Sequence, residues 1–311
     1  MSLAFVFPGQ GSQSVGMLAG LAEAEPLVTE TFAEASDALH YDLWQLVQRG
    51  PEAALNATDK TQPAMLAASV AVWRVWQAAG GTMPDALAGH SLGEYSALVC
   101  AGTLDFGAAV RLVEYRGRLM QAAVPEGEGA MAAILGLDDG TVRAVCADAA
   151  GGEVVEAVNF NAPGQVVIAG HAAAVARAMD GALARGAKRA VRLPVSVPSH
   201  CSLMREAAQQ LAACLDDATL RPPRIPVLHN VDAGEHVAPA EIRRALASQL
   251  HHPVLWTDSI RALAARGVDR IVECGPGKVL QGLVKRIDRS LAASAIHDPQ
   301  TLATNLEADQ D

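Results

Sequence analysis

Short apolar runs alternate with longer amphipathic segments along nearly the whole chain. The runs at Leu3–Phe7, 85–88, 225–229 and Arg270–Cys274 have the length of buried strands. Between the runs, apolar residues recur at helical spacing. The pattern predicts helices over 94–101, 241–250, 259–266 and 278–288. This alternation is typical of a mainly parallel sheet covered by helices, so we predict an α/β fold.

The middle of the chain follows a different order, strand-helix-strand-strand-helix-strand. Its predicted strands are 131–135, 154–158, 165–169 and 189–193, and its predicted helices are 139–150 and 172–185. This βαββαβ order is typical of a ferredoxin-like unit, with 160–164 predicted as the turn between the inner strands. We therefore expect a small subdomain at 126–195, inserted into a larger unit made of 1–125 and 196–311, with a ligand site between the two. We predict a frayed tail over 305–311.

Composition excludes several classes of protein. Of the 311 residues, 50% are hydrophobic and 19% are charged, which excludes a disordered or fibrous chain. The net charge is 24 − 34 = −10, which argues against nucleic acid as the main partner. Five cysteines, an odd number without a C-x-x-C pair, predict reduced thiols and a cytoplasmic location. Neither a signal peptide nor an apolar run long enough for a membrane span is recognisable, and no metal site or membrane partner is expected.

The sharpest local signal is Gly-His-Ser-Leu-Gly at 89–93, between a predicted strand and a predicted helix. In this context a G-x-S-x-G segment forms a nucleophile elbow, in which two glycines allow a tight turn that lifts the serine hydroxyl out of the sheet. The N–H of Leu92, at the start of the helix, is then free to bind an oxyanion. We predict Ser91 as a nucleophile.

A serine hydroxyl needs a base, and nine histidines are available. Local sequence does not choose among them, although the place of His200 on a proline-containing loop, where the small unit rejoins the large one, favours it. The other histidines weighed here lie inside the motif turn, at element ends predicted to face solvent, or in a helix C-cap pair: His90, His171, His236, His297, His251 and His252. The order Ser, acid, late His of α/β-hydrolases is not met, because 111 residues follow His200.

Two further segments bear on ligand binding. The glycine-rich turn at 7–13 follows the first strand, yet it lacks the third glycine of a dinucleotide-binding fingerprint, so an oxyanion donor and a purely structural turn both stay open. Arg116 lies on a segment with helical apolar spacing. If its side chain points into the site, the planar guanidinium suits a substrate carboxylate, whereas most arginines on such helices are solvated.

Taken together, the motifs resemble those of the malonyl-CoA:acyl carrier protein transacylases of type II fatty acid synthesis. The resemblance extends from residue 5 to about 295. It rests on six segments that fall in the family's order: Phe-Pro-Gly-Gln-Gly-Ser-Gln at 7–13, Gly-His-Ser-Leu-Gly-Glu at 89–94, Tyr-Arg-Gly-Arg at 115–118, Asn-Phe-Asn-Ala-Pro-Gly-Gln at 159–165, Val-Pro-Ser-His at 197–200 and Gly-Pro-Gly-Lys at 275–278. The family's fold is an α/β-hydrolase-like core with an inserted ferredoxin-like subdomain, as the element order also predicts.

The resemblance implies a role for each matching residue. Ser91 would be acylated and His200 would be its base, oriented by the backbone carbonyl at Gln249 in place of an acidic residue. The backbone N–H groups of Gln10 and Leu92 would form the oxyanion hole. Two more roles concern the substrate: Arg116 would bind its carboxylate and Asn161 would lie near it. Ser199, just before the histidine, is the residue of the stand-alone enzymes and favours malonyl as the acyl group.

The implied reaction is a ping-pong transfer of malonyl from malonyl-CoA to the phosphopantetheine thiol of acyl carrier protein, supplying fatty acid synthesis without a resident cofactor. Three alternatives stay open at this point. A thioesterase or esterase would use the same serine and histidine, and the malonyltransferase subunit of a malonate decarboxylase-type complex would share the motifs. A catalytically silent carrier-protein-binding module is the third, which the intact Ser91, His200 and Arg116 disfavour.

Overall fold

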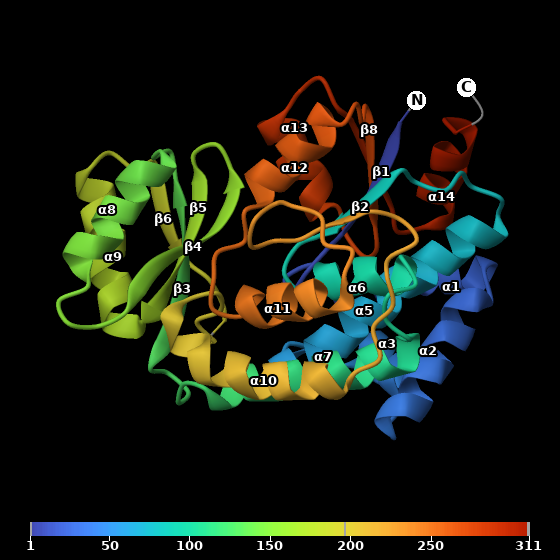
Figure 1. The fold of residues 1–311 in the computed structure, drawn as a ribbon, viewed down its shortest axis with the longest axis horizontal. Helices are drawn as coiled ribbons and strands as arrows, with labels where there is room; N and C mark the ends of the chain where they lie inside the picture. The colour runs from blue at the N-terminus through green and yellow to red at the C-terminus, as the bar shows by residue number, and fades with distance from the viewer. Residues whose placement is uncertain (1, 196, 310–311) are drawn as a thin grey trace.

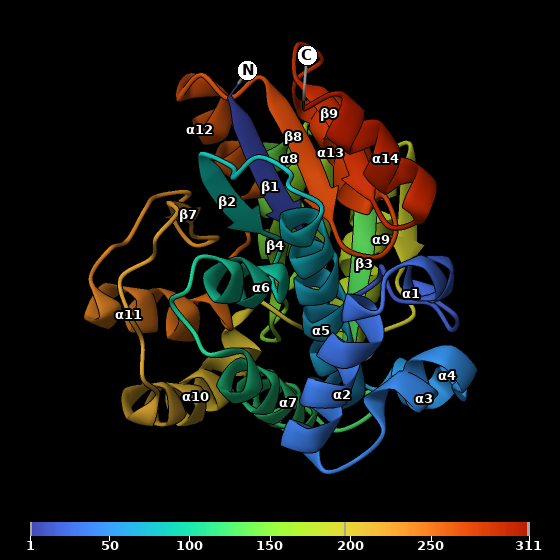
Figure 2. The same ribbon diagram turned by 90° about the vertical axis from the view of Figure 1, so that its right-hand side faces the viewer.

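The larger unit of the molecule is built on a five-stranded parallel sheet, called sheet A here. The computed structural model describes residues 2–195 and 197–309. In sheet A the strand order is β7-β2-β1-β8-β9, and every paired neighbour runs parallel. Figure 2 shows β1 between β2 and β8. The strands are β1 (Leu3–Phe7), β2 (Ala86–Gly89), β7 (Val227–Leu228), β8 (Arg270–Cys274) and β9 (Ala292–Ile296).

Strand β1 is fully buried because helices cover both faces of sheet A. Alternate residues of a strand point to opposite faces, so Phe5 and Phe7 enter one hydrophobic core while Ala4 and Val6 enter another. The Phe5 ring packs edge-on against Trp73 of α5 (Thr58–Ala78), with ring centroids 5.7 Å apart. This burial fixes the end of β1, from which the turn at 8–13 leaves the sheet.

The first of these cores is shared mainly with α2 (Leu27–Leu39), α5, α6 (Gly93–Cys100), α7 (Phe106–Ala122) and α10 (Arg205–Asp217). The second lies under α12 (Trp256–Ala265) and α13 (Val279–Ile287). The other helices of the larger unit are α1 (Ala19–Ala24), α3 (Leu43–Arg49), α4 (Glu52–Leu55), α11 (Pro239–Gln249), α14 (Pro299–Glu307) and the short 3-10 turn at Ser202–Met204.

A separate four-stranded sheet, called sheet B here, lies beside the larger unit with α8 and α9 on its outer face (Figure 1). Its strand order is β4-β5-β3-β6, and every pairing is antiparallel. Numbered within the unit, this is the 4-1-3-2 order of a ferredoxin-like sheet read from the other edge. The elements are β3 (Gly129–Leu135), α8 (Asp139–Ala149), β4 (Val155–Ala162), β5 (Gln165–His171), α9 (Ala172–Ala184) and β6 (Arg189–Arg192).

The two sheets confirm the predicted fold class, a parallel α/β layer with a ferredoxin-like unit. The boundaries of an inserted subdomain at 126 and 195 stay a prediction. Within the described residues, no helix combines the length and the apolar character needed to cross a membrane.

Three local predictions were wrong. The turn predicted over 160–164 is confined to Pro163 and Gly164, because β4 continues to Ala162: Phe160 is buried, and its N–H binds the carbonyl of Val254. The tail predicted over 305–311 is helical up to Glu307, since the buried Asn305 side chain binds two backbone carbonyls; residues 310–311 lie outside the described part. The strand predicted over 225–229 shortens to Val227–Leu228, where it pairs with β2.

Candidate active site

Ser91 lies on the turn that joins β2 to α6, where its backbone is left-handed with φ of +52°. The turn is so tight that neither flanking glycine has room for a side chain. A Cβ on Gly89 would lie 1.9 Å from the carbonyl carbon of Gly93, and one on Gly93 would lie 2.0 Å from the oxygen of Phe7. Both glycines of the motif are therefore required by packing, and they hold a serine in a strained conformation at the carboxyl end of the parallel strands.

The serine hydroxyl contacts a histidine from a distant loop. Ser91 Oγ lies 2.7 Å from His200 Nε2. The other ring nitrogen, Nδ1, lies 2.7 Å from the backbone carbonyl oxygen of Gln249, at the end of α11. A carbonyl only accepts, so Nδ1 carries the proton and Nε2 is left as the acceptor for the hydroxyl. The structure thus brings together Ser91, His200 and Gln249 in the arrangement of a nucleophile, a base and an orienting group.

The environment keeps His200 neutral. Its side chain is buried, and burial followed by the positive charge of Arg116 lowers the pKa of His200 to about 3. The ring of His90 contributes in the same direction, whereas the bond to Gln249 opposes it. A neutral imidazole is the form that can take a proton from a hydroxyl, so the base is available without a titration near neutral pH.

Arg116, on α7, is 1% exposed and points into the site rather than into solvent. Its Nη1 donates to Gln62 Oε1 at 2.8 Å, and its Nη2 donates to Gln249 Oε1 at 2.9 Å and to Ser91 Oγ at 3.4 Å. Among the described residues it forms no ion pair with a carboxylate, and its Nε has no acceptor. Burial lowers the pKa of Arg116, and Tyr95 and Glu94 oppose that shift. A buried guanidinium held by two neutral amides leaves its charge free for an anionic ligand.

The two predicted oxyanion donors line the same cavity as Ser91. In the described part of the chain, the backbone N–H groups of Gln10 and Leu92 form no hydrogen bond with another group. The N–H of Ser91 itself is occupied by Asn230 Oδ1 at 2.7 Å. Leu92 also stands at the N-terminus of α6, where the helix dipole favours negative charge. These features suit an oxyanion next to the serine.

The cavity measures about 520 Å³ and lies between the two sheets. The turn after β2 and helix α7 contribute the polar end around Ser91 and Arg116, while sheet B contributes Met131, Val167 and Asn161. Asn161 Oδ1 binds His90 Nε2 at 2.8 Å, so Asn161 lines the cavity and fixes the ring next to the serine. The cavity has a charged polar end and an apolar wall, which suits a long substrate with an anionic head.

Several residues of this site carried no signal of their own in the sequence. Gln62 lies in the interior of α5, and Asn230 follows the two-residue strand β7; both are buried. His229 is buried and binds Glu94. In the sequence, Glu94 stood out only as the last residue of the motif at 89–94. The remaining histidines weighed as bases, apart from His90, do not line the cavity.

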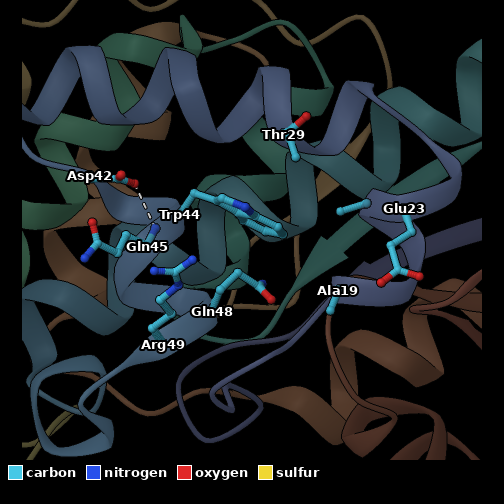
Figure 3. A pocket seen from close by; sticks show the side chains of 9 residues that line it. Ala19, Glu23, Thr29, Asp42, Trp44, Gln45, Gln48 and Arg49 are labelled. Atoms are coloured by element: carbon cyan, nitrogen blue, oxygen red, sulfur yellow. Dashed lines mark hydrogen bonds between the residues drawn. The ribbon is translucent and has the colours of Figure 1, made fainter.

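A second hollow, of about 490 Å³, lies on the surface between α1, α2 and α3 (Figure 3). Trp44, Gln48 and Arg49 line it, and Asp42 accepts a hydrogen bond from the backbone of Gln45 at the start of α3. It contains no serine, cysteine or histidine side chain and is widely open to solvent. The cavity between the sheets, which holds Ser91, His200 and Arg116, is therefore the candidate active site.

Comparison with known proteins identifies the family of this chain. The family model described as "Acyl transferase domain" matches residues 4–311. The chain belongs to that family. It is 60% identical over 304 residues to the malonyl CoA-acyl carrier protein transacylase of Escherichia coli K12, covering 98% of each chain. It is 46% identical over 301 residues to that of Bacillus subtilis, covering 96% of this chain and 95% of the relative.

Solved structures agree with these relatives. An acyl carrier protein S-malonyltransferase from Vibrio cholerae matches with a TM-score of 0.96 and 57% identity, covering 98% of this chain and 99% of that one. A malonyl-transacylase in complex with its type II PKS acyl-carrier protein matches with a TM-score of 0.98 and 57% identity, covering 99% and 100%. The resemblance inferred from the motifs is confirmed.

The low pKa of His200 predicts the pH dependence of acylation. The base form of His200 persists down to a pKa of about 3, so kcat/KM for acylation of Ser91 should stay level from about pH 8 to about pH 5. A solvent-exposed histidine would titrate within that interval. p-Nitrophenyl acetate is a suitable substrate, since it has no titrating group of its own. Circular dichroism at each pH controls for unfolding, and an acid limb centred near 6.5 would contradict the argument.

Proposed function

We propose that this protein transfers the malonyl group of malonyl-CoA to the phosphopantetheine thiol of acyl carrier protein, through a malonyl ester on Ser91. One observation carries the proposal: a buried guanidinium without a carboxylate partner lies 3.4 Å from the hydroxyl that His200 binds at 2.7 Å. An acyl group with its own carboxylate supplies the missing negative charge. The transacylases that this chain matches over nearly its whole length support the choice of malonyl.

The first half-reaction breaks the thioester bond and forms an oxygen ester. His200 Nε2 takes the Ser91 proton as Oγ attacks the thioester carbonyl, and the oxyanion that develops faces the N–H groups of Gln10 and Leu92. The intermediate then collapses, the C–S bond breaks, and His200 returns the proton to the departing thiolate of coenzyme A. The malonyl group remains on Ser91.

The second half-reaction runs the same steps in reverse with the carrier-protein thiol as the nucleophile. The thiol gives its proton to His200, its sulfur attacks the ester carbonyl, and Ser91 leaves as the alcohol. No electrons are transferred in either half, so serine and histidine suffice and we propose no resident cofactor. We place the enzyme in fatty acid biosynthesis and in the cytoplasm; its five free cysteines support a reducing compartment.

Substrate binding also assists the base. Burial is the largest cause that lowers the pKa of His200, and the positive charge of Arg116 is the second. A malonyl carboxylate bound to that guanidinium offsets the charge, which strengthens the base at the moment when the acyl group is in place. Acetyl-CoA has no carboxylate and leaves the base weak, so the preference for malonyl has a chemical part as well as a binding part.

Intact-mass spectrometry tests the proposed reaction. The purified protein mixed with malonyl-CoA alone should gain one malonyl group, and phosphopantetheinylated carrier protein added afterwards should remove it and gain it. Ser91→Ala should show no adduct, because the ester cannot form without the hydroxyl. Rapid release of free malonate without transfer would favour a thioesterase, and the absence of any adduct on the wild-type protein would leave a binding module.

Replacing Arg116 tests the carboxylate site. Arg116→Ala should lower kcat/KM for malonyl-CoA by about 100-fold relative to acetyl-CoA, since hydrogen bonds to a charged group contribute about 1.5–3 kcal/mol. Steady-state transfer to carrier protein with both donors measures the ratio. Arg118→Ala is the matched control, because Arg118 lies on the same helix, is exposed and pairs with Glu114. An unchanged malonyl preference in Arg116→Ala would refute the role.

A further inference from the structure

A buried carboxylate that takes no part in the reaction above lies directly behind the active site. Glu94 is on α6, three residues after Ser91, and its side chain is 1% exposed. One oxygen accepts from His229 Nδ1 at 2.7 Å. The other accepts from the backbone N–H of Asn230 at 3.0 Å and from Gln249 Nε2 at 2.8 Å. Every donor around it comes from the segments that carry the active site.

Through Gln249 this carboxylate reaches Arg116. The Gln249 amide nitrogen donates to Glu94 and to the backbone oxygen of Ser91, at 2.8 and 2.9 Å. Its amide oxygen, on the opposite side, accepts from Arg116 Nη2 at 2.9 Å. A carboxylate only accepts and a guanidinium only donates, so one orientation of the amide satisfies both neighbours. The reverse orientation would set oxygen against oxygen and NH₂ against the guanidinium.

The amide also separates two opposite charges. The charge of Glu94 acts on Arg116, and a direct ion pair between the two would neutralise the charge that a substrate carboxylate would bind. With Gln249 between them, Arg116 is held at one nitrogen by Gln249 and at the other by Gln62, both neutral. The guanidinium is thus fixed in orientation and left without a counter-ion.

We propose that Glu94 is a positioning residue for substrate selection: it orients the Gln249 amide, and the amide orients Arg116 for the substrate carboxylate. The inference rests on the proposed function, because it concerns the choice of malonyl over acetyl. Glu94 touches neither the substrate nor the reacting atoms. Its effect is therefore on the discrimination between donors rather than on the reaction of Ser91 alone.

Glu94→Ala should lower the malonyl-to-acetyl ratio of kcat/KM at least about tenfold, because the Gln249 amide then keeps only the Ser91 carbonyl as a close acceptor and holds Arg116 less firmly. Glu94→Gln should retain the ratio. Its amide oxygen can still accept from Gln249 and Asn230, and its NH₂ can donate to His229 once that ring shifts its proton to Nε2, which has no partner among the described residues. A merely structural role would lower both donors' kcat/KM equally and leave the ratio unchanged.

A double-mutant cycle tests whether the effect passes through Gln249. Gln249→Leu keeps the backbone carbonyl that orients His200 and removes only the amide, so it should lower the ratio to a similar extent. The double variant should be no worse than either single variant, since both cut the same relay. Additive losses, or an unchanged ratio in Glu94→Ala or Gln249→Leu, would overturn the proposal. If Glu94→Ala does not fold, the malonyl-to-acetyl ratios of Gln249→Leu and Glu94→Gln are compared instead. A lowered ratio in Gln249→Leu with an unchanged ratio in Glu94→Gln would support the proposal, and any other result would overturn it.

The matched control is Glu273→Ala. Glu273 is also a buried carboxylate, on β8, and it binds the backbone N–H of Gln281 at the start of α13, away from Gln249 and Arg116. Its loss should reduce stability without changing the ratio. Two measurements distinguish failure of the proposed function from failure of the role of Glu94. Failure of the wild-type protein to form a malonyl adduct refutes the proposed function. Normal transfer by the wild-type protein with an unchanged ratio in Glu94→Ala refutes only the role of Glu94.

Discussion

A positive charge buried without a negative partner is the feature around which the active site is organised. Removing a guanidinium from water is costly, and proteins usually meet the cost with an ion pair. Here the fold supplies two amide oxygens, from Gln62 and Gln249, and the face of the Tyr95 ring, 5.5 Å from the guanidinium carbon, but no carboxylate among the described residues pairs with it. Burial, followed by this charge, lowers the pKa of His200. In the proposed function, Arg116 therefore takes part both in selecting the substrate and in setting the strength of the base.

The fold makes this arrangement by bringing distant segments to the carboxyl ends of the parallel strands. Strand β1 ends at the turn that carries Gln10, and β2 ends at the turn that carries Ser91. Because Gly93 packs against the oxygen of Phe7, these two turns are in direct contact. Sheet B completes the cavity with the apolar side chains of Met131 and Val167 and with Asn161.

The sequence predicted what local patterns determine. The alternation of apolar runs predicted the parallel layer, and the βαββαβ order predicted the second sheet with its helices. The motif at 89–93 located the serine because the tight turn requires glycine on both sides of it, and all of these residues lie within five positions. The histidine could be favoured only by position and resemblance, since His200 lies 109 residues from Ser91 and the contact is purely tertiary.

Other features were beyond local patterns for the same reason. Gln62 and Asn230 acquire their roles from partners more than 50 residues away. The Gln249 side chain is bound by groups from two helices, α6 and α7, and from the turn that carries Ser91. The turn predicted at 160–164 was wrong because the pairing of β4 with β5 continues to Ala162 and Gln165. Tertiary hydrogen bonds, which local composition does not encode, account for the roles of Gln62, Asn230 and the Gln249 side chain.

Equilibrium binding to Ser91→Ala tests the central claim most directly, because the variant keeps Arg116 and its partners but cannot be acylated. Isothermal titration calorimetry would compare malonyl-CoA with acetyl-CoA, which differ by the carboxylate alone. An unpaired guanidinium predicts that malonyl-CoA binds at least about tenfold more tightly, with the difference lost in the Ser91→Ala, Arg116→Ala double variant. Equal affinities for the two thioesters would contradict the account.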